Sequence, residues 1–405
     1  MPEQLTIGMV VDNEFYGDPR VYNEAKVLLQ AGYCIKVLCL NYGKYPVRET
    51  FDGIEIVRVS IKKKTKDRLS ALMLTLPFYR WFWRKAISEF IVSENIDVLH
   101  AHDLYMGRSA KEGINNKGIP LVLDLHENYP AAIMGYNWAN RYPARVIVRP
   151  TRWKRLESKY LQMADKIIMI SEDFRKDVLK RFPSLDEKNL VVYPNVPDLE
   201  ELLSYPIDED IIDKKKRYFA FYFGGIAERR GIFTCFEALK LLVKKYPAIT
   251  LLLIGPVDKA DQERFNQYLK DPLITGNVIY YEWKDISLLP SFIAISDVCL
   301  SPLIKNAQHE SGIANKVFQY MLFERPIIVS DCRPQHELIE NEKCGYVFTN
   351  EDAEDLAHKI EKLYNDPDLS KRMGVNGRVA ALTKYNVGAF RKNLEGLYTQ
   401  FKKIN

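Results

Sequence analysis

The sequence predicts an α/β protein with two doubly wound domains in tandem, each a parallel sheet covered by helices on both faces. Short segments rich in β-branched residues alternate with helical patterns along most of the chain. This alternation breaks once, near residue 196, in a stretch rich in proline and charge. The length of 405 residues also leaves room for two domains, at roughly 100–200 residues per domain.

The first domain is expected to cover residues 1–195. Its strands are predicted in six short apolar segments: 5–11, 34–40, 54–59, 97–101, 121–125 and 166–170. Asp18 followed by Pro19 has the pattern of an N-cap with proline in the first turn, which predicts that a helix begins there. Strands that alternate with helices in this way favour parallel pairing.

Residues 196–216 are predicted to be a linker, and the second domain is expected over 217–383. Six further strands are predicted there: 218–223, 250–254, 277–281, 297–301, 326–330 and 345–348. After residue 352 the pattern is helical. Residues 384–405 are amphipathic, so we expect a C-terminal helix that packs back on the first domain.

The composition is that of an ordinary globular protein, with 47% hydrophobic and 27% charged residues. The six cysteines form no C-x-x-C pair, so we expect buried free thiols and neither disulfides nor a zinc site. The first residues lack a basic segment followed by an apolar one, and no run of about 18 apolar residues occurs. We therefore expect neither a signal peptide nor a membrane span.

Positive charge is concentrated in two segments of the first domain, although the net charge is only +5. Residues 61–85 carry eight basic residues against Asp67, and 141–159 carry seven against Glu157. A negatively charged partner is expected at both. Residues 74–87 also interleave aromatic and basic side chains, which suits an anionic membrane surface, a buried helix edged with arginines, or a nucleic acid. We favour the membrane surface and expect no nucleic acid partner.

The functional loops can be located from the topology. In the common strand order 3-2-1-4-5-6, the loops after strands 1 and 4 open a crevice at the carboxyl ends of the strands. In the second domain these loops are 224–231 and 302–316. In the first domain they are 12–18 and 102–107, with the HENYP segment after strand 5 beside them.

The second-domain loops carry cations where a helix begins. Arg229 and Arg230 precede one predicted helix, and Lys316 lies in the first turn of another. Cations are disfavoured at this end of a helix, so they indicate either a site for a diphosphate or solvated surface charge. Gly224 and Gly225 would let a ligand approach the backbone closely. Neither G-x-G-x-x-G nor G-x-x-x-x-G-K-[ST] occurs, which disfavours dinucleotide oxidoreductases and P-loop NTPases.

The first-domain loops carry histidines and acids. His100, His102 and His126 could form a metal cluster, but we favour hydrogen bonds to a polar ligand, with His126 as a substrate contact. Two D-x-D pairs, 208/210 and 366/368, are interpreted as solvated acids or caps. We therefore expect no metal site and no cofactor.

Ten segments together resemble the retaining GT-B glycosyltransferases of glycosyltransferase family 4. They occur in that family's order and spacing over nearly the whole chain: DPRVYNEAKVLLQAGY, DVLHAHDLYMG, LVLDLHENYP, ADKIIMISE, YPNV, GGIAERRGI, LLLIGP, SDVCLSPL, NKVFQYMLFERPIIVSD and CGYVF. The resemblance implies a GT-B fold, with two Rossmann-like domains facing each other across a cleft. It also implies a nucleotide-sugar donor in the second domain and an acceptor in the first.

The resemblance further implies roles for particular residues. Arg230 matches the cation that binds the donor diphosphate, Lys316 lies at the start of the facing helix, and His126 matches the histidine beside the reacting sugar; these three form the expected catalytic set. The expected donor-binding set is Gly224, Gly225, Arg229, Glu310, Ser311, Gly312, Asn315, Gln319 and Glu282. The expected acceptor-binding set is Asp12, Gly17, Arg20, His102, Asp103 and Glu127. In this family the departing diphosphate helps deprotonate the acceptor, so no metal is expected.

The sequence departs from the family pattern at three places. Gly225 stands where many members have arginine. The family's paired glutamates fall on Ser311, or on Glu310 after a one-residue shift, and on Gln319. Glu282 stands where glycine is common, which leaves the preferred base open.

We expect a cytoplasmic glycosyltransferase, peripheral on the inner face of the cytoplasmic membrane. It would transfer a sugar, with retention, to a lipid-linked or cell-surface saccharide. The membrane contact would use residues 61–85 and 141–159. The alternatives are a nucleotide-sugar epimerase on the same fold and a non-catalytic subunit that binds a nucleotide-sugar.

Overall fold

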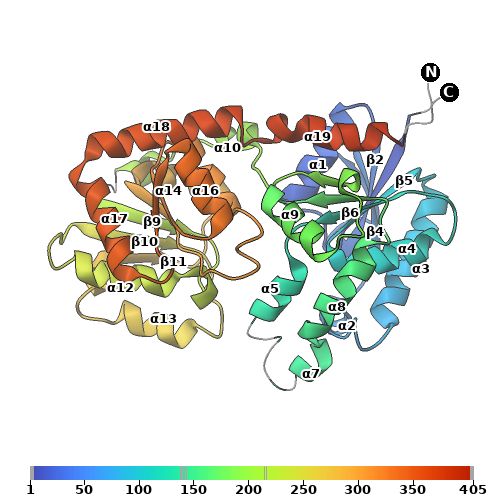
Figure 1. The fold of residues 1–405 in the computed structure, drawn as a ribbon, viewed down its shortest axis with the longest axis horizontal. Helices are drawn as coiled ribbons and strands as arrows, with labels where there is room; N and C mark the ends of the chain where they lie inside the picture. The colour runs from blue at the N-terminus through green and yellow to red at the C-terminus, as the bar shows by residue number, and fades with distance from the viewer. Residues whose placement is uncertain are drawn as a thin grey trace. The chain divides into compact units, whose positions relative to one another are not determined.

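A computed structural model describes residues 4–401 except 137, 138, 140, 141, 143, 214 and 216. The chain forms two compact units (Figure 1). Unit 1 contains the residues up to Asn195 and those from Phe390 onward, and unit 2 is Val196–Ala389. Both are α/β units with mainly parallel sheets, as the sequence predicts.

Unit 1 has an eight-stranded sheet in its described part, in the order β3-β4-β2-β1-β5-β6-β7-β8. Only the β3–β4 pair is antiparallel among the pairs described. The strands are β1 (Thr6–Val10), β2 (Cys34–Asn41), β3 (Arg48–Phe51), β4 (Ile54–Ser60), β5 (Val98–His102), β6 (Leu121–Leu125), β7 (Lys166–Met169) and β8 (Leu190–Val192). The six predicted strands are confirmed. The sequence analysis missed β3 and β8, which are short and lie at the two sheet edges.

The helices of unit 1 cover the sheet and extend beyond one end of it. They are α1 (Pro19–Gln30), α2 (Lys63–Ala71), α3 (Phe78–Ser93), α4 (Gly107–Ile114), α5 (Tyr129–Gly135), α7 (Ala144–Val148), α8 (Pro150–Leu161) and α9 (Glu172–Arg181). The predicted cap is confirmed, because the Asp18 side chain accepts a hydrogen bond from the Val21 amide. Figure 1 shows α2, α7 and α8 gathered at one end of the unit.

Unit 2 has a six-stranded sheet in its described part, in the order β11-β10-β9-β12-β13-β14, with every described pair parallel. The strands are β9 (Tyr218–Phe223), β10 (Ile249–Ile254), β11 (Val278–Tyr281), β12 (Val298–Ser301), β13 (Ile327–Ser330) and β14 (Gly345–Phe348). All six predicted strands are confirmed. β9 and β12 are neighbours, as the predicted strand order requires, so the point where the connections diverge lies at their carboxyl ends.

The helices of unit 2 begin with two short ones in the stretch 196–216, which the sequence analysis assigned to a linker. These are α10 (Leu199–Ser204) and α11 (Glu209–Ile212); Lys214 and Lys216 lie outside the described residues. The others are α12 (Ile232–Leu242), α13 (Gln262–Leu269), α14 (Leu289–Ile295), α15 (Asn315–Leu322), α16 (Arg333–Glu342), α17 (Ala353–Asn365) and α18 (Pro367–Thr383).

The last helix, α19 (Val387–Thr399), ends in unit 1. Its Leu394, Leu397 and Tyr398 are buried, and the Tyr398 hydroxyl lies 2.7 Å from Nδ1 of His100 on β5. Residues 402–405 of the predicted C-terminal segment lie outside the described residues. Among the helices described, none has both the length and the apolar character needed to cross a bilayer.

Candidate functional site

Glycine-bearing turns follow β9 at the carboxyl end of the unit 2 sheet, where the strand order predicts a crevice. Gly224 has φ +122° and Gly231 has φ +73°, backbone conformations that glycine adopts without strain. A Cβ on Gly231 would lie 1.6 Å from the Pro302 carbonyl oxygen, so the loop after β12 packs directly on the start of α12. Arg229 and Arg230 occupy the 3₁₀ turn just before this glycine. This tight packing fixes the backbone position of the turn that carries Arg229 and Arg230.

Lys316 is a buried cation at the start of α15. Only 9% of the residue is exposed, and Nζ lies 3.7 Å from the centre of the Tyr222 ring. Burial, and then the neighbouring Arg230, hold the pKa of this ammonium group well below its usual range. In the described part of the chain, no carboxylate lies within 4.0 Å of the charged atoms of Lys316 or Arg230. Two neighbouring basic side chains therefore have no acidic partner within the part of the chain that the structure describes, which favours an anionic ligand.

The segment between β12 and α15 adds a histidine that the sequence analysis missed. His309 is 4% exposed, and its Nδ1 lies 2.6 Å from the Ile304 carbonyl oxygen. Burial and the nearby cations, Arg230 first among them, lower its pKa to about 4. Its Nε2 is buried without a hydrogen-bond partner among the described residues, as is Oδ1 of Asn315. Both atoms are available to a ligand.

The other donor-site residues are placed as follows. Glu310 Oε1 accepts a hydrogen bond from the Arg333 amide, and the Ser311 hydroxyl donates to the Ala307 carbonyl. Gly225 is exposed, and Gln319 on α15 is half-buried. Glu282 is exposed just after the edge strand β11. Gly312 is half-buried and precedes α15.

In unit 1, a buried charge network centres on Asp124 of β6. Arg20 donates to its two oxygens from Nε and Nη2 at 2.8 and 2.6 Å, and to the Tyr193 carbonyl at 3.1 Å. Burial alone would raise the pKa of Asp124, but Arg20 and His126 hold it well below its usual range. Arg20 is only 4% exposed, and its guanidinium group pairs with the buried carboxylate of Asp124.

His126 lies at the edge of this network, with 18% of its side chain exposed. Its Nε2 lies 2.9 Å from Asp124 Oδ2 and 3.0 Å from His102 Nδ1, and its Nδ1 lies 3.9 Å from Asp103 Oδ1. Burial lowers the pKa of His126, but the Asp103 and Asp124 carboxylates outweigh burial and raise it to about 9. His126 is therefore a cation held at the ends of β5 and β6.

Four buried groups behind His126 could also ligate a metal ion. Glu24, His100, His102 and Asp124 offer ligand atoms that lie within 4.8 Å of one another. However, the Arg20 guanidinium already pairs with Asp124 and lies 3.2 Å from Glu24. The chain thus supplies its own cation to these carboxylates. The sequence analysis missed the role of Glu24 and Asp124.

A cavity of about 590 Å³ lies next to this network; His126 does not line it, but Asp103 and Glu127 do, and we call it the acid–aromatic pocket. It is lined by Asp12, Asp103 and Glu127 from the predicted acceptor set. Of that set, Arg20 and His102 do not line it, because they are buried in the network, and the exposed Gly17 does not line it either. Its other lining residues include Lys66, Tyr105, Tyr129, Tyr136 and Trp153.

Two acids of this pocket are held in unusual states. Burial raises the pKa of Asp12 to about 6, although Lys66 opposes this, and Asp12 accepts a hydrogen bond from the Tyr79 hydroxyl. Asp103 has φ +71°, a strained conformation for a residue other than glycine, and its amide donates to the Asp124 carbonyl at 2.8 Å. Strain of this kind is concentrated at functional sites.

Two family models match the chain and together cover most of it. Glycosyltransferase Family 4 matches residues 19–201, and Glycosyl transferases group 1 matches residues 206–380. The chain belongs to the family 4 glycosyltransferases. The glycosyltransferase is 24% identical over 246 residues to the capsular polysaccharide biosynthesis glycosyltransferase CapM of Staphylococcus aureus, covering 59% of this chain and 63% of that protein. It spans less than two thirds of the first curated relatives that it matches.

Solved structures show the same fold. Sucrose-phosphate synthase from Thermosynechococcus elongatus aligns with a TM-score of 0.75 and 18% identity, over 98% of this chain and 99% of that one. Anabaena HepE in complex with UDP-glucose aligns with a TM-score of 0.70 and 13% identity, over 98% and 100%. The predicted GT-B fold is thereby confirmed.

Proposed function

We propose that this glycosyltransferase moves a sugar from a nucleotide-diphosphate donor bound in unit 2 to a saccharide acceptor bound in unit 1. The observation that carries the proposal is the pair Arg230 and Lys316, which lie close together and have no acidic partner within 4.0 Å among the described residues. A diphosphate would supply the missing negative charge. That HepE was solved with UDP-glucose agrees with a nucleotide-sugar as the donor.

The proposed chemistry is transfer with retention and without a metal ion. As the bond between the sugar and the diphosphate breaks, negative charge grows on the departing oxygen, and Arg230 and Lys316 stabilise it more strongly than in the ground state. The departing oxygen then accepts the proton of the attacking hydroxyl. The cation His126 would contact the donor or acceptor sugar, so it would orient hydroxyl groups rather than act as a base.

The acid–aromatic pocket suits a saccharide acceptor. Carboxylates such as Asp103 and Glu127 accept hydrogen bonds from sugar hydroxyls, and aromatic rings pack against the apolar faces of sugar rings. We infer that the acceptor is a lipid-linked or cell-surface saccharide. The resemblance to a glycosyltransferase of capsular polysaccharide biosynthesis supports a role in polysaccharide synthesis.

We also propose that unit 1 binds the inner face of an anionic membrane through residues 61–85 and 141–159, of which 141 and 143 lie outside the described residues. Helix α3 is both core and surface: Tyr79 and Trp83 are buried, whereas Phe78 is 51% and Trp81 46% exposed. Exposed rings next to the basic segments suit the interfacial layer of a bilayer.

The test is a thermal-shift panel of UDP, GDP, ADP, TDP and CMP, each with and without EDTA. A ligand at 100 times its Kd adds about 2.7 kcal/mol of stability. One diphosphate should stabilise the wild type, with or without EDTA, and fail to stabilise Arg230→Ala. The control is Lys270→Ala, an exposed lysine at the end of α13.

Turnover of the identified donor in Arg230→Ala should fall by roughly 10² or more, the loss typical of one preorganised donor. No stabilisation by any nucleotide, or near-normal turnover in Arg230→Ala, would contradict the proposal. Nucleotide binding without sugar transfer to cell-envelope lipid would instead indicate a non-catalytic subunit.

A further inference from the structure

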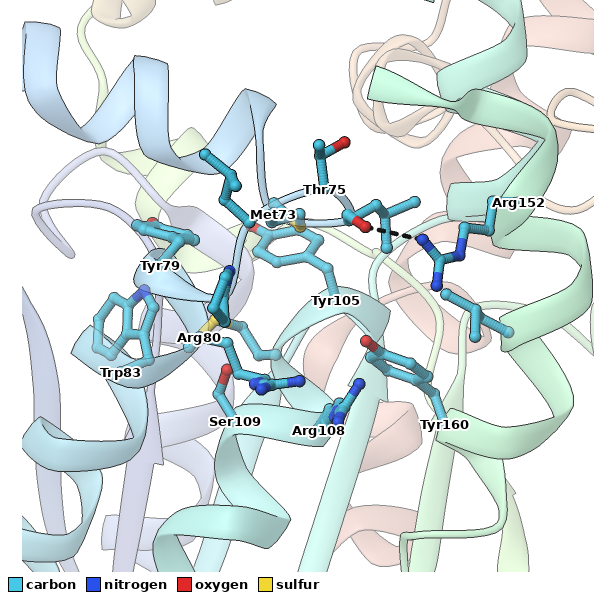
Figure 2. A pocket seen from close by; sticks show the side chains of 15 residues that line it. Met73, Thr75, Tyr79, Arg80, Trp83, Tyr105, Arg108, Ser109, Arg152 and Tyr160 are labelled. Carbon is cyan, nitrogen blue, oxygen red and sulfur yellow. Dashed lines mark hydrogen bonds between the residues drawn. The ribbon is translucent and has the colours of Figure 1, made fainter. Parts of the chain in front are cut away.

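A second cavity of unit 1, of about 180 Å³, is lined by three arginines from three different helices. These are Arg80 of α3, Arg108 of α4 and Arg152 of α8, and we call the cavity the arginine pocket. Figure 2 shows the three side chains around it, together with Tyr105 and Tyr160. No acidic residue lines the pocket in the described part of the chain.

The described carboxylates near the pocket do not balance the positive charge of its three arginines. Glu112 is the one carboxylate within 4.0 Å of their charged atoms among the described residues: its two oxygens lie 3.3 Å from Arg80 Nε and 2.9 Å from Arg108 Nε. Arg152 donates instead to the Leu74 carbonyl at 2.9 Å (Figure 2). Two guanidinium groups therefore share one carboxylate and the third contacts none among the described residues, which leaves a formal charge of about +2.

The pocket also offers polar groups and room. The Ser109 side chain is 5% exposed and Tyr160 is 6% exposed, so both form its inner wall. Burial raises the pKa of the Tyr160 hydroxyl, and Arg108 and Arg80 oppose this. One water needs roughly 10–15 Å³, so the cavity accommodates a group of several heavy atoms, such as a phosphate.

The arginine pocket adjoins the acid–aromatic pocket. Tyr105 and Met73 line both cavities, and the Tyr105 hydroxyl donates to Asp103 at 3.1 Å. The two pockets differ in chemistry, because one presents carboxylates beside rings and the other presents guanidinium groups. A ligand that spans them would place hydroxyl groups in the first and a strong anion in the second.

We propose that the arginine pocket binds a phosphate or diphosphate group of the acceptor, so that the acceptor of this transferase is a phosphorylated saccharide. Guanidinium groups bind phosphate oxygens with two parallel hydrogen bonds. A phosphate monoester carries a charge of about −1.5 to −2, which balances the pocket's formal charge better than a single carboxylate does. This inference rests on the proposed function, because it assumes that the acid–aromatic pocket holds the acceptor sugar.

The experiment is a calorimetric titration of inorganic pyrophosphate into the full chain carrying Arg230→Ala, which keeps the donor site out of the measurement. Arg152→Gln should weaken binding by at least roughly tenfold. Arg152 is exposed and makes one described hydrogen bond, so its loss leaves the fold intact. Arg80→Gln with Arg108→Gln should abolish binding. The matched control, Lys111→Gln, removes an exposed cation of α4 that does not line the pocket and should stay within about twofold.

Two further arms identify the source of the phosphate. If farnesyl diphosphate binds at least roughly tenfold more tightly than pyrophosphate, the phosphate belongs to a lipid-linked acceptor. If glucose 6-phosphate binds at least roughly tenfold more tightly than pyrophosphate, the phosphate belongs to a soluble acceptor. Either result, if it depends on Arg152, supports the pocket. Equal affinities in Arg152→Gln and Lys111→Gln, or no binding of pyrophosphate at about 10 mM, would overturn it. Nucleotide binding by the wild type, measured separately, shows whether the proposed function fails as well.

Discussion

Replacing Asp124 by asparagine should destabilise unit 1 strongly while changing only one oxygen to nitrogen. Asp124 accepts two hydrogen bonds from Arg20, at 2.8 and 2.6 Å, and lies 2.9 Å from His126. The substitution leaves Arg20, which is 4% exposed, buried without its main counter-ion. Breaking a buried ion pair in this way costs about 3–5 kcal/mol. At about 2–4 °C per kcal/mol for a domain of this size, the melting temperature of unit 1 should fall by roughly 6–20 °C.

The assay is thermal unfolding followed by tryptophan fluorescence. Four of the five tryptophans lie in residues 1–195, and Trp83 and Trp153 are buried in the unit 1 core, so the signal reports mainly on unit 1. The matched control is Glu89→Gln, which removes the same charge from an exposed pair with Lys85 at 3.8 Å and should change stability by less than about 0.5 kcal/mol.

A double variant separates the ion pair from simple loss of a carboxylate. Arg20→Gln combined with Asp124→Asn should be less destabilised than the sum of the two single variants by roughly 1–3 kcal/mol, because Arg20 and Asp124 are then not left buried without each other. If Asp124→Asn behaves like Glu89→Gln, or if the two single effects simply add, the assignment of Arg20 and Asp124 as a stabilising pair is wrong.

Three further predictions follow from the two sites. Lys316 has a lowered pKa, which a bound diphosphate should raise. Diphosphate binding should therefore take up a proton, and its affinity should fall as pH rises through the pKa of Lys316 in the free protein. Heats of binding that do not vary with the ionisation enthalpy of the buffer would contradict this. The pKa of His126 is raised to about 9. The stability that protonated His126 contributes is therefore complete below about pH 6.5 and is lost as pH rises through 9. Over that pH range, the difference in unfolding free energy between wild type and His126→Gln should shrink by on the order of 3 kcal/mol. Gly231→Ala places a Cβ 1.6 Å from the Pro302 carbonyl and should lower stability by more than about 1–2 kcal/mol and weaken nucleotide binding, whereas Gly276→Ala, which has open space, should leave both unchanged.

Much of the fold could be predicted because strands that are buried on both faces leave a strong signal in the sequence. All twelve predicted strands occur, and the β1/β5 and β9/β12 neighbours locate both crevices. The edge strands β3 and β8 escaped prediction for different reasons: β3 (RETF) is largely exposed and has no apolar run, and β8 (LVV) is apolar but only three residues long. The segment 196–216 was predicted as a linker for a similar reason: helices as short as α11 have too few turns to show periodicity.

The candidate site shows why a cation in the first turn of a helix does not by itself identify a ligand site. Arg20 and Lys316 occupy equivalent positions and gave the same signal in the sequence, yet Arg20 contacts the carboxylates of Asp124 and Glu24, whereas Lys316 has none within 4.0 Å among the described residues. The information that separates them lies elsewhere in the chain. Asp124 interrupts the apolar strand β6, and a carboxylate in a fully buried strand requires a cationic partner. Within unit 2, none of the strands β9, β10 and β12 contains an acid, so these strands offer no carboxylate that would compete with a ligand for Lys316 and Arg230.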